Sequence, residues 1–281
     1  MKTMLIAECG SCHDRRLHRA VALIQAAAAA GATVVKFQFW SDSSTLAVRR
    51  HAPELVEMYE RYALPVQWLP LLRDEAHARG IEFACTSYLP QDVGTVAQYA
   101  DLLKISSFEA QDPELLAAHV PAACAGKQIV VSLGMNASDG MIALNLDGPV
   151  LVASGRSFAA DRLLCVSAYP APHEELGLRE LRHGMSTRAV FSGFSDHSLG
   201  TETWTGALAV AAGARIVERH IRLHDTDQAN PDYPHAMPPA LFAEYVEHIR
   251  YAERALGDGT CGVRPSEEPM LKYRVDVSLA G

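Results

Sequence analysis

Short runs rich in Val, Ile and Leu alternate along the chain with longer amphipathic stretches, and this alternation constrains the fold more than any other feature. Each run is apolar throughout rather than on one side only, which is typical of strands buried on both faces of a parallel sheet. The eight predicted strands cover residues 4–8, 33–38, 81–86, 101–106, 128–133, 162–167, 189–195 and 214–220. Eight strand-helix units in about 260 residues predict an α/β fold, a single-domain (β/α)8 TIM barrel.

Helix signals fill the intervals between these runs. Pro113 stands at the first position of one predicted helix, where its missing N–H breaks no helical hydrogen bond, and Gly80 ends another as a C-cap. The first predicted helix ends at Gly31. The others cover residues 69–80, 91–99, 113–126 and 199–213. A doubly wound open sheet is the alternative fold. Against it, the first turn, ECGSCHDRR, lacks a GxGxxG fingerprint, and no composition shift divides the chain into lobes.

Charge and apolar content exclude several classes of protein. The net charge of −8 argues against a nucleic-acid binder or a protein of anionic membrane surfaces, because both need a surplus of Lys and Arg. The apolar start of the chain is interrupted by Glu8, and the longest apolar stretch, residues 20–30, is shorter than the roughly 20 residues that span a bilayer. We therefore expect a cytoplasmic protein with neither a signal peptide nor a membrane anchor.

Six cysteines are scattered along the chain, at positions 9, 12, 85, 124, 165 and 261. Their spacing does not resemble the disulfide framework of a small secreted domain, so reduced thiols are expected. Cys9 and Cys12 form a CxxC, but no second pair supplies the other half of a structural zinc site. We interpret the cysteines as ordinary strand-end and loop residues.

Two histidines, His197 and His220, stand where successive predicted strands end. Neighbouring strands lie only about 4.8 Å apart, so both imidazoles could bind one metal ion. Either histidine alone is better explained as a strand cap that makes ordinary hydrogen bonds. Catalytic groups of this fold gather at the carboxyl ends of the strands, and further polar residues end the earlier strands. These residues are Glu8, Lys36, Thr86, Lys104 and Ser132. Together they indicate an enzyme.

The two strand lysines need an anionic partner, because a buried unpaired charge is costly. Residues i and i+2 of a strand share a face, which points Lys36 and Lys104 into the barrel and Arg219 toward the helices. A protein carboxylate, Glu8 or Glu109, could be the partner. The sharper interpretation is a phosphate or carboxylate of the substrate, helped by nearby hydroxyl groups. Those hydroxyls belong to Thr86, Ser107, Ser132 and Ser195.

An ordered series of motifs resembles the sialic acid synthase family over nearly the whole chain. The motifs are IAECG at 6–10 with His13, VVKFQ at 34–38, FACTS at 83–87, LLKISS at 102–107, VVSLGM at 130–135, CVSAYPAP at 165–172, GFSDHSLG at 193–200, VERHIRL at 217–223 and ALGDG to KYR at 255–274. The resemblance implies a (β/α)8 barrel that condenses phosphoenolpyruvate with an aldose, such as an N-acetylmannosamine, to give a nonulosonic acid and phosphate.

The resemblance also implies residue roles. The metal ligands are His197 and His220, with Mn²⁺ or Mg²⁺ as the ion, and His220 also counts among the catalytic residues with Glu8 and Glu218. The phosphoenolpyruvate residues are Lys36, Thr86, Lys104, Ser107, Ser132 and Ser195, with Ser167 beside the phosphate. The acceptor-sugar residues are Gln38, Tyr169 and Asp232. Which glutamate acts as the base is left open.

Departures from the family pattern concern mainly the acceptor side. We expect a barrel at 1–265 and a tail at 266–281, without the antifreeze-like domain that typical members carry. The first loop reads Cys-His-Asp-Arg at 12–15 instead of Asn-His-Asn-Gly, and Ser87 and Phe108 replace the usual Pro and Gly. A different aldehyde, a homodimer and a separate antifreeze-like domain protein as partner all remain open.

Each assignment has a structural alternative. Tyr169 alone suits a rim aromatic, and Asp232 in a Pro-rich loop suits a turn. His13, His224 and His235 are interpreted as solvated loop residues with no assigned role, and the Arg and Tyr residues of 49–62 suit either a substrate entrance or a charged surface helix. For the whole protein, the alternatives are a metal-dependent aldolase or hydrolase on a sugar-like substrate, or a catalytically silent barrel that binds a sugar phosphate. Lysines without a neutralising protein carboxylate would favour the anionic donor.

Overall fold

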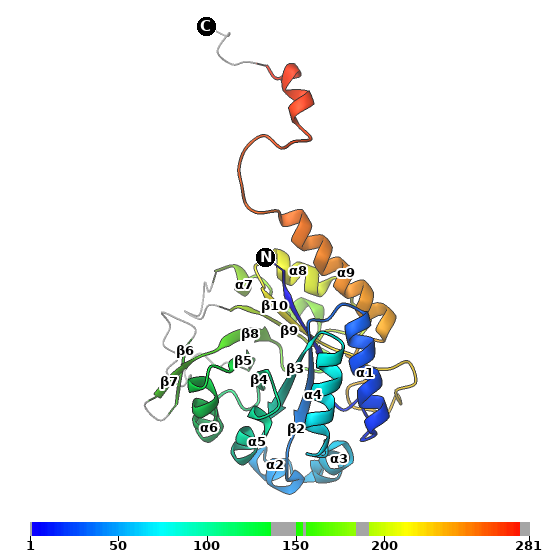
Figure 1. Cartoon of the computed structure of the whole chain (residues 1–281), viewed down its shortest axis with the longest axis vertical. Coiled ribbons are helices and arrows are strands. Elements are labelled where there is room, and N and C mark those ends of the chain that lie inside the picture. The colour runs from blue at the N-terminus through cyan, green and yellow to red at the C-terminus, as the bar shows by residue number, and fades with distance from the viewer. Residues whose placement is uncertain (1, 136–149, 154–155, 184–190, 276–281) are drawn as a thin grey trace.

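The computed structural model describes residues 2–135, 150–153, 156–183 and 191–275, and within them eight parallel strands close into a barrel surrounded by helices (Figure 1). The barrel strands are β1 (Met4–Glu8), β2 (Val34–Phe39), β3 (Glu82–Ser87), β4 (Leu102–Ile105), β5 (Gln128–Leu133), β8 (Asp161–Cys165), β9 (Gly193–Asp196) and β10 (Ile216–His220). Around the barrel they follow the order β1-β10-β9-β8-β5-β4-β3-β2. The predicted (β/α)8 barrel is confirmed.

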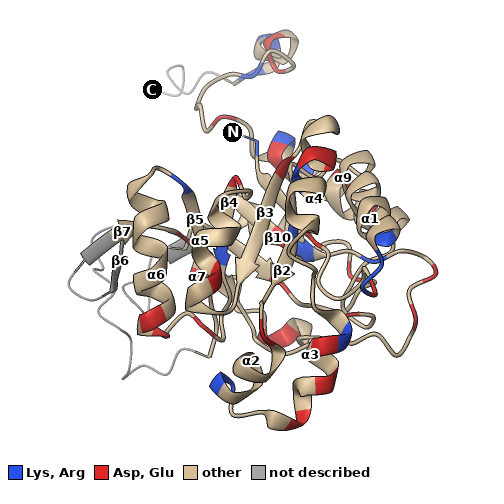
Figure 2. Cartoon of the chain, turned by 60° about the horizontal axis from the view of Figure 1, so that its bottom comes forward, with Lys and Arg blue, Asp and Glu red and all other residues tan. Residues whose placement is uncertain are grey.

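Most helices lie between successive strands of the barrel, and the last helix follows β10. They are α1 (Leu17–Ala29), α2 (Ser43–Arg49), α3 (Val56–Tyr62), α4 (Trp68–Ala78), α5 (Val93–Ala97), α6 (Pro113–Cys124), α7 (Glu180–His183), α8 (Thr205–Ala211) and α9 (Pro239–Leu256). Short 3-10 helices lie at Pro53–Leu55 (η1), Pro90–Asp92 (η2), His173–Glu175 (η3) and Glu268–Tyr273 (η4). Charged residues of both signs lie on α3 and α9 (Figure 2).

Two predicted elements begin later than expected, and one pair of strands was not predicted. The helix predicted at 199–213 begins only at Thr205, because the chain first forms the loop that carries His197. The strand predicted at 189–195 begins at Gly193, and its positions 189–190 lie outside the described residues. An antiparallel pair, β6 (Val150–Ala153) with β7 (Arg156–Ala159), was not expected and lies between β5 and β8 in sequence.

The interior of the barrel is built in layers. Its apolar layer consists of buried strand residues, namely Ile6, Val34, Ala84, Leu102, Val130, Leu163 and Ile216. Residues two positions further along a strand point inward again, one layer closer to the carboxyl ends. That next layer is almost entirely polar, with Glu8, Lys36, Thr86, Lys104, Ser132, Ser195 and Glu218, joined by Cys165. The barrel therefore changes from apolar to polar within a single step on most of its strands.

Gly193 lets β9 and β10 approach closely, and its replacement by Ala is expected to destabilise the barrel. A Cβ at this position would lie 2.0 Å from the Ile216 backbone oxygen, and Ile216 is its strand partner. Because backbone must move to relieve that clash, we expect Gly193→Ala to lower the free energy of unfolding by about 3 kcal/mol or more. Gly94→Ala in α5 is the matched control, since a Cβ there meets nothing within 4 Å. Denaturant unfolding should show the control unchanged or stabilised by about 0.4–1 kcal/mol, and equal midpoints for the two variants would contradict the argument.

The chain leaves the barrel after α9. Residues 257–275 are exposed and carry η4 away from the barrel (Figure 1), and residues 276–281 of the predicted tail lie outside the described part of the chain. Among the described residues, no helix combines the length and apolar character needed to span a membrane.

Candidate active site

A cavity of about 880 Å³ opens at the carboxyl ends of the barrel strands. Most of the predicted site residues line it, namely Lys36, Gln38, Lys104, Ser107, Ser132, Tyr169, Ser195, His197, Glu218, His220 and Asp232. Three other predicted site residues lie behind the cavity wall, where they contact residues that line it. Thr86 accepts a hydrogen bond from Lys36 Nζ at 3.0 Å, Ser167 Oγ lies 2.7 Å from Ser107 Oγ, and Glu8 forms an ion pair with Lys36.

Two lysines and Glu218 lie on the floor of the cavity, Glu8 lies behind it, and all four are buried. Lys36 pairs with Glu8, and its Nζ lies 3.6 Å from Glu218 Oε1. Lys104 Nζ lies 3.9 Å from the same Glu218 oxygen and donates to the Ile105 carbonyl at 3.1 Å. Burial lowers the pKa of Lys104, whereas for Lys36 the attraction of Glu218 and Glu8 outweighs burial and raises the pKa. Lys36 is thus already neutralised by a protein carboxylate, and Lys104 is only loosely paired.

The two glutamates differ in access and ionisation. Glu218 lines the cavity and accepts a hydrogen bond from Ser195 Oγ at 3.2 Å. Burial acts to raise its pKa, but Lys104 and Lys36 outweigh burial, so the net shift of the Glu218 pKa is downward. Burial raises the pKa of Glu8, and its Oε1 accepts from the Gly10 amide at 2.7 Å and from Gln38 Nε2 at 2.9 Å. Of the two glutamates, Glu218 is therefore the one that faces the cavity.

The two predicted metal-ligand histidines lie next to each other, with ring centroids 5.8 Å apart. Burial lowers the pKa of His197 to about 4 and also lowers that of His220, so both rings are neutral at physiological pH, the form that binds metals. His197 Nδ1 bonds to the Val166 carbonyl at 2.8 Å, and its Nε2 lies 3.3 Å from Ser195 Oγ. Its assignment as a ligand stays a prediction.

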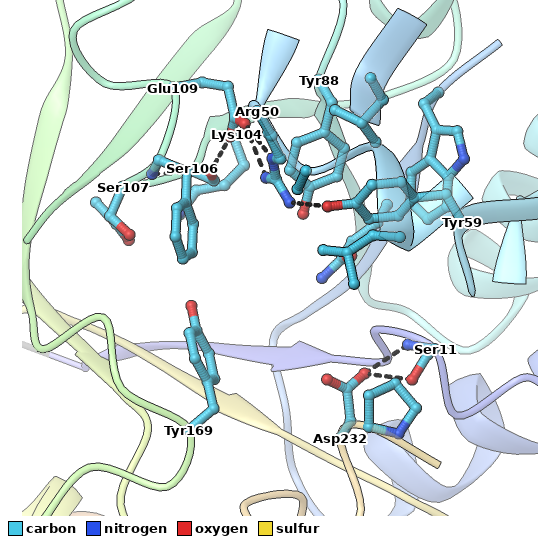
Figure 3. Close-up of a pocket in the computed structure, with 18 of the residues that line it drawn as sticks. Ser11, Arg50, Tyr59, Tyr88, Lys104, Ser106, Ser107, Glu109, Tyr169 and Asp232 are labelled. Carbon is cyan, nitrogen blue, oxygen red and sulfur yellow. Dashed lines mark hydrogen bonds and ion pairs between the residues drawn. The ribbon is translucent and has the colours of Figure 1, made fainter. Parts of the chain in front are cut away.

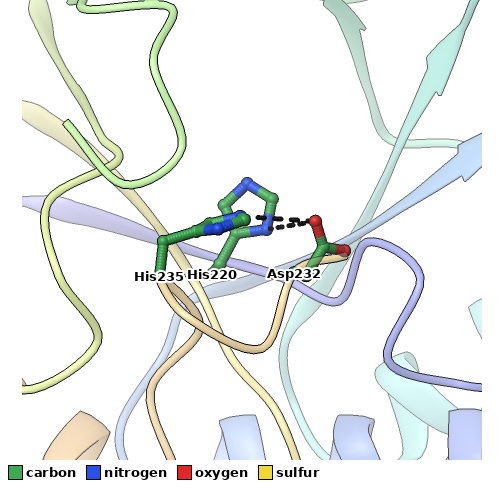
Figure 4. Close-up of side chains that lie close together, drawn as sticks. All are labelled: His220, Asp232 and His235. Atoms are coloured by element: carbon green, nitrogen blue, oxygen red, sulfur yellow. Dashed lines mark ion pairs between the residues drawn. The ribbon is translucent and has the colours of Figure 1, made fainter. Parts of the chain in front are cut away.

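A third histidine, His235, lies beside His220 (Figure 4). The ligand atoms of His220, Asp232 and His235 all lie within 4.8 Å of one another. His220 Nδ1 is buried without a hydrogen-bond partner among the described residues, which suits a nitrogen that binds a divalent metal. The interpretation of His235 as a solvated loop residue is wrong, because the residue is 1% exposed. Its spacing of three residues from Asp232, just after the last strand, was the available signal.

The other two loop histidines differ in burial. His13 is also buried, with its ring 6.2 Å from those of Phe37 and Trp68, so its interpretation as a solvated residue is wrong too. His224 is exposed, as predicted.

The mouth of the cavity has an aromatic wall that includes residues of α3. The Arg50 guanidinium lies over the rings of Tyr88 and Phe108, at 4.7 and 5.0 Å from their centroids, donates to Tyr59 Oη at 3.2 Å and pairs with Glu109 at 2.8 Å (Figure 3). Tyr169 and Asp232 face this wall across the cavity. Residues 49–62 thus contribute an entrance, and Glu109 pairs with Arg50 rather than with a strand lysine.

Comparison with known proteins gives one family. The NeuB family model matches residues 23–261. The chain is 29% identical to the pseudaminic acid synthase of Campylobacter jejuni, over 98% of this chain and 80% of that protein. It is 30% identical to the N,N'-diacetyllegionaminic acid synthase of Legionella pneumophila, over 96% of this chain and 78% of that protein.

A solved structure agrees with these sequence matches. The crystal structure of N-acetylneuraminic acid (sialic acid) synthetase from Leptospira borgpetersenii, in complex with citrate, has a TM-score of 0.83 at 25% identity, over 99% of this chain and 93% of that chain. The matches cover the barrel and every strand that contributes to the cavity. The chain therefore belongs to the NeuB family and is a sialic acid synthase-like enzyme.

Proposed function

We propose that the protein condenses phosphoenolpyruvate with an aldose, N-acetylmannosamine or a related aldehyde, to give a nonulosonic-acid-type 2-keto-3-deoxy acid and phosphate. The observation that carries the proposal is the polar layer of the barrel, where Lys36, Lys104 and Glu218 all open into one cavity. Relatives that share the barrel are named as synthases of pseudaminic and N,N'-diacetyllegionaminic acid. A buried site with two cations suits an anionic donor.

Lys104 and the neighbouring hydroxyls are the groups best placed for the donor's anionic groups. Lys104 has no carboxylate oxygen closer than 3.9 Å among the described residues, so its charge is available to a ligand. Ser132, on the adjacent strand β5, has a buried Oγ without a hydrogen-bond partner in the described part of the chain. Ser107 and Ser167 add a hydroxyl pair 2.7 Å apart. These groups would hold the phosphate and stabilise the charge that develops as it leaves.

The reaction needs one carboxylate base. The enol carbon of phosphoenolpyruvate forms a bond to the aldehyde carbon of the sugar, and the aldehyde oxygen takes up a proton from solvent and becomes a hydroxyl group. A cationic carbon is left on the donor. Water adds there and gives up a proton to Glu218, which lines the cavity and has a lowered pKa. The bond between carbon and the phosphate oxygen of the resulting tetrahedral intermediate then breaks, phosphate leaves with the proton of the new hydroxyl group, and the 2-keto acid remains. Glu8, which holds Lys36 from behind the cavity wall, is a positioning residue.

A divalent metal, Mn²⁺ or Mg²⁺, belongs to the proposal. His197 and His220 would hold it, and when bound it supplies Lewis-acid polarisation of the aldehyde oxygen. The acceptor itself would lie between Tyr169 and the aromatic wall, within reach of Gln38 and Asp232. Tyr169 is 42% exposed and its ring centroid lies 4.3 Å from that of His197, so a sugar can stack on it beside the metal ligands.

Phosphate release from phosphoenolpyruvate tests the proposal. With Mn²⁺ and a panel of aldoses, N-acetylmannosamine first, we expect release that requires both aldose and metal and disappears in His220→Ala. If no aldose triggers release, but phosphoenolpyruvate raises the melting temperature of wild type and not of Lys104→Met, the donor assignment stands and the acceptor assignment fails. The absence of any thermal shift with phosphoenolpyruvate would overturn the proposal.

One observation favours the second candidate, a metal-dependent aldolase or hydrolase on a sugar-like substrate. Lys36 is neutralised by Glu8, and a lysine already paired does not require an anionic donor. The same assay separates the two functions, since only the synthase consumes phosphoenolpyruvate.

A further inference from the structure

Strained backbone lies on the side of the barrel where the cavity opens. A positive φ costs free energy for any residue with a Cβ, and glycine avoids that cost. The described non-glycine residues with a positive φ all belong to connections that follow a barrel strand, and they are Asp14, Arg15, His51 and Met135. At the opposite end, turns that lead from a helix into a strand use glycine, namely Gly31, Gly80, Gly126 and Gly213. The strained side chains on the cavity side therefore require an explanation.

Contacts with other loops explain the first two of these residues. Asp14 pairs with Arg19 at 3.1 Å and accepts a hydrogen bond from Asn230 Nδ2 at 3.0 Å. The Arg15 guanidinium donates to the Glu60 carbonyl at 2.9 Å. These side chains join the loop after β1 to the loop after β10 and to α3, and this stabilisation offsets the strain of their backbone.

His51 has no such contacts. It follows the C-cap residue Arg50 of α2, and its amide donates to the Val48 carbonyl at 3.1 Å while the Ala52 amide donates to the Ala47 carbonyl at 2.9 Å. This pair of bonds is a Schellman motif, in which the position of His51 is usually glycine. The His51 side chain is exposed, and no hydrogen bond, ion pair or ring contact offsets its strain within the described part of the chain.

The His51 imidazole lines the cavity beside two arginines that already have partners. Arg49 pairs with Asp112, and Arg50 pairs with Glu109 at 2.8 Å. Both guanidinium charges are thus neutralised by protein carboxylates. The imidazole beside them is left free to bind a ligand.

We propose that His51 is a specificity-determining residue that forms a hydrogen bond with a hydroxyl or amide group of the acceptor sugar. An imidazole can donate and accept hydrogen bonds, and so can these groups. Figure 3 shows Arg50, the preceding residue, across the cavity from Tyr169 and Asp232, so a sugar stacked on Tyr169 lies on the side that His51 faces. The inference deepens the proposed function and rests on it for the identity of the ligand.

His51→Gly separates a role in binding from a role in the fold. Glycine relieves the strain at a φ of 53°, so the melting temperature should rise by about 2–4 °C. Loss of one hydrogen bond should raise the KM for the aldose by about 3- to 10-fold, with kcat and the KM for phosphoenolpyruvate unchanged. Thermal melting and steady-state phosphate release measure these effects.

Two further variants serve as controls. His51→Asn keeps a hydrogen-bonding side chain that tolerates a positive φ, so its KM for the aldose should lie between those of wild type and His51→Gly. Gly80→His makes the opposite change at the far end of the barrel, where the φ is 72° and a Cβ meets nothing within 4 Å. It should lower the melting temperature by about 2–4 °C and leave both KM values unchanged.

Direct binding distinguishes failure of this inference from failure of the condensation. If no aldose of the panel releases phosphate, titration calorimetry with the same aldoses is performed on protein that contains Mn²⁺ and phosphoenolpyruvate. An aldose affinity that falls by about 3- to 10-fold in His51→Gly would then support the role of His51 and refute the condensation. An unchanged KM or aldose affinity in His51→Gly, a lower melting temperature of this variant, or no binding of any aldose to wild type would overturn the proposal.

Discussion

Replacement of Glu218 by Gln is expected to lower kcat by about 10²- to 10⁴-fold, the usual contribution of a general base. The substitution keeps the shape of the side chain and its contact with Ser195 Oγ, but removes the ability to accept a proton. Glu218 has the access and the charge for this role, since it lines the cavity and the two lysines hold its pKa below the ordinary value. Steady-state phosphate release at saturating substrates measures the loss.

Glu8→Gln is the matched comparison. Glu8 does not line the cavity and contacts Lys36, Gln38 and the Gly10 amide, so we expect its loss to raise the KM for phosphoenolpyruvate more than it lowers kcat. A pH profile adds a second readout. Because the Glu218 pKa is lowered from 4.5, wild type should lose its rate only below about that pH, and this acid limb should persist in Glu8→Gln but vanish in Glu218→Gln. A kcat that survives Glu218→Gln within 10-fold but falls with Glu8→Gln would exchange the two roles.

The barrel was predictable because its strands obey one strong rule. Strands buried on both faces must be apolar, so each barrel strand appears in the sequence as a Val-, Ile- or Leu-rich run. The polar layer was predictable for the same reason, since a charged residue such as Lys36 inside an apolar run is costly unless it faces a site. The β6–β7 pair is a separate antiparallel sheet outside the barrel, and the rule for parallel strands therefore does not detect it.

Contacts between distant segments could not be predicted from the sequence. Glu8 and Lys36 are direct partners in the pairing of β1 with β2, a register that decides in favour of Glu8 over Glu109 but is set only when the barrel closes. Arg50 forms an ion pair with Glu109 because the end of α2 lies against the loop that follows β4. The burial of His235 depends likewise on the loop that brings Asp232 against Ser11. Local spacing gave no means to rank these partners.

The buried ion pair behind the site carries the second large prediction. Arg219 and Asp196 are direct partners in the pairing of β10 with β9, on the outer face of the barrel, and their side chains lie 2.8 Å apart at 1% and 0% exposure. Arg219 was predicted to face the helices, and it also donates to the Ser198 and Leu199 carbonyls. Asp196 Oδ2 accepts from Tyr245 Oη at 2.8 Å. This network joins β9 and β10 at the two residues that directly precede His197 and His220.

Asp196→Ala should lower the free energy of unfolding by about 3–5 kcal/mol, because it leaves the Arg219 guanidinium buried without its counter-charge. For a chain of this size the melting temperature should fall by about 6–20 °C. Tyr245→Phe, which removes one hydrogen bond to the same carboxylate, should cost only about 1 kcal/mol. The double variant Asp196→Leu with Arg219→Met should recover much of the loss, since apolar residues can replace a buried pair at little cost. An Asp196→Ala variant with the same free energy of unfolding as wild type would contradict this account.

The same pair predicts a pH dependence of stability. Burial acts to raise the pKa of Asp196, but Arg219 and the hydrogen bonds from Thr205 and Ser198 outweigh burial and lower it from 3.8. The unfolded chain therefore binds a proton at higher pH than the native protein, and the stabilisation is complete above about pH 4 and lost as the pH falls through the lowered native pKa. Calorimetric melting of wild type and Asp196→Ala should give a difference that is constant at neutral pH and shrinks only below pH 3.8. A difference that shrank already between pH 7 and 5 would show that a group other than Asp196 controls the effect.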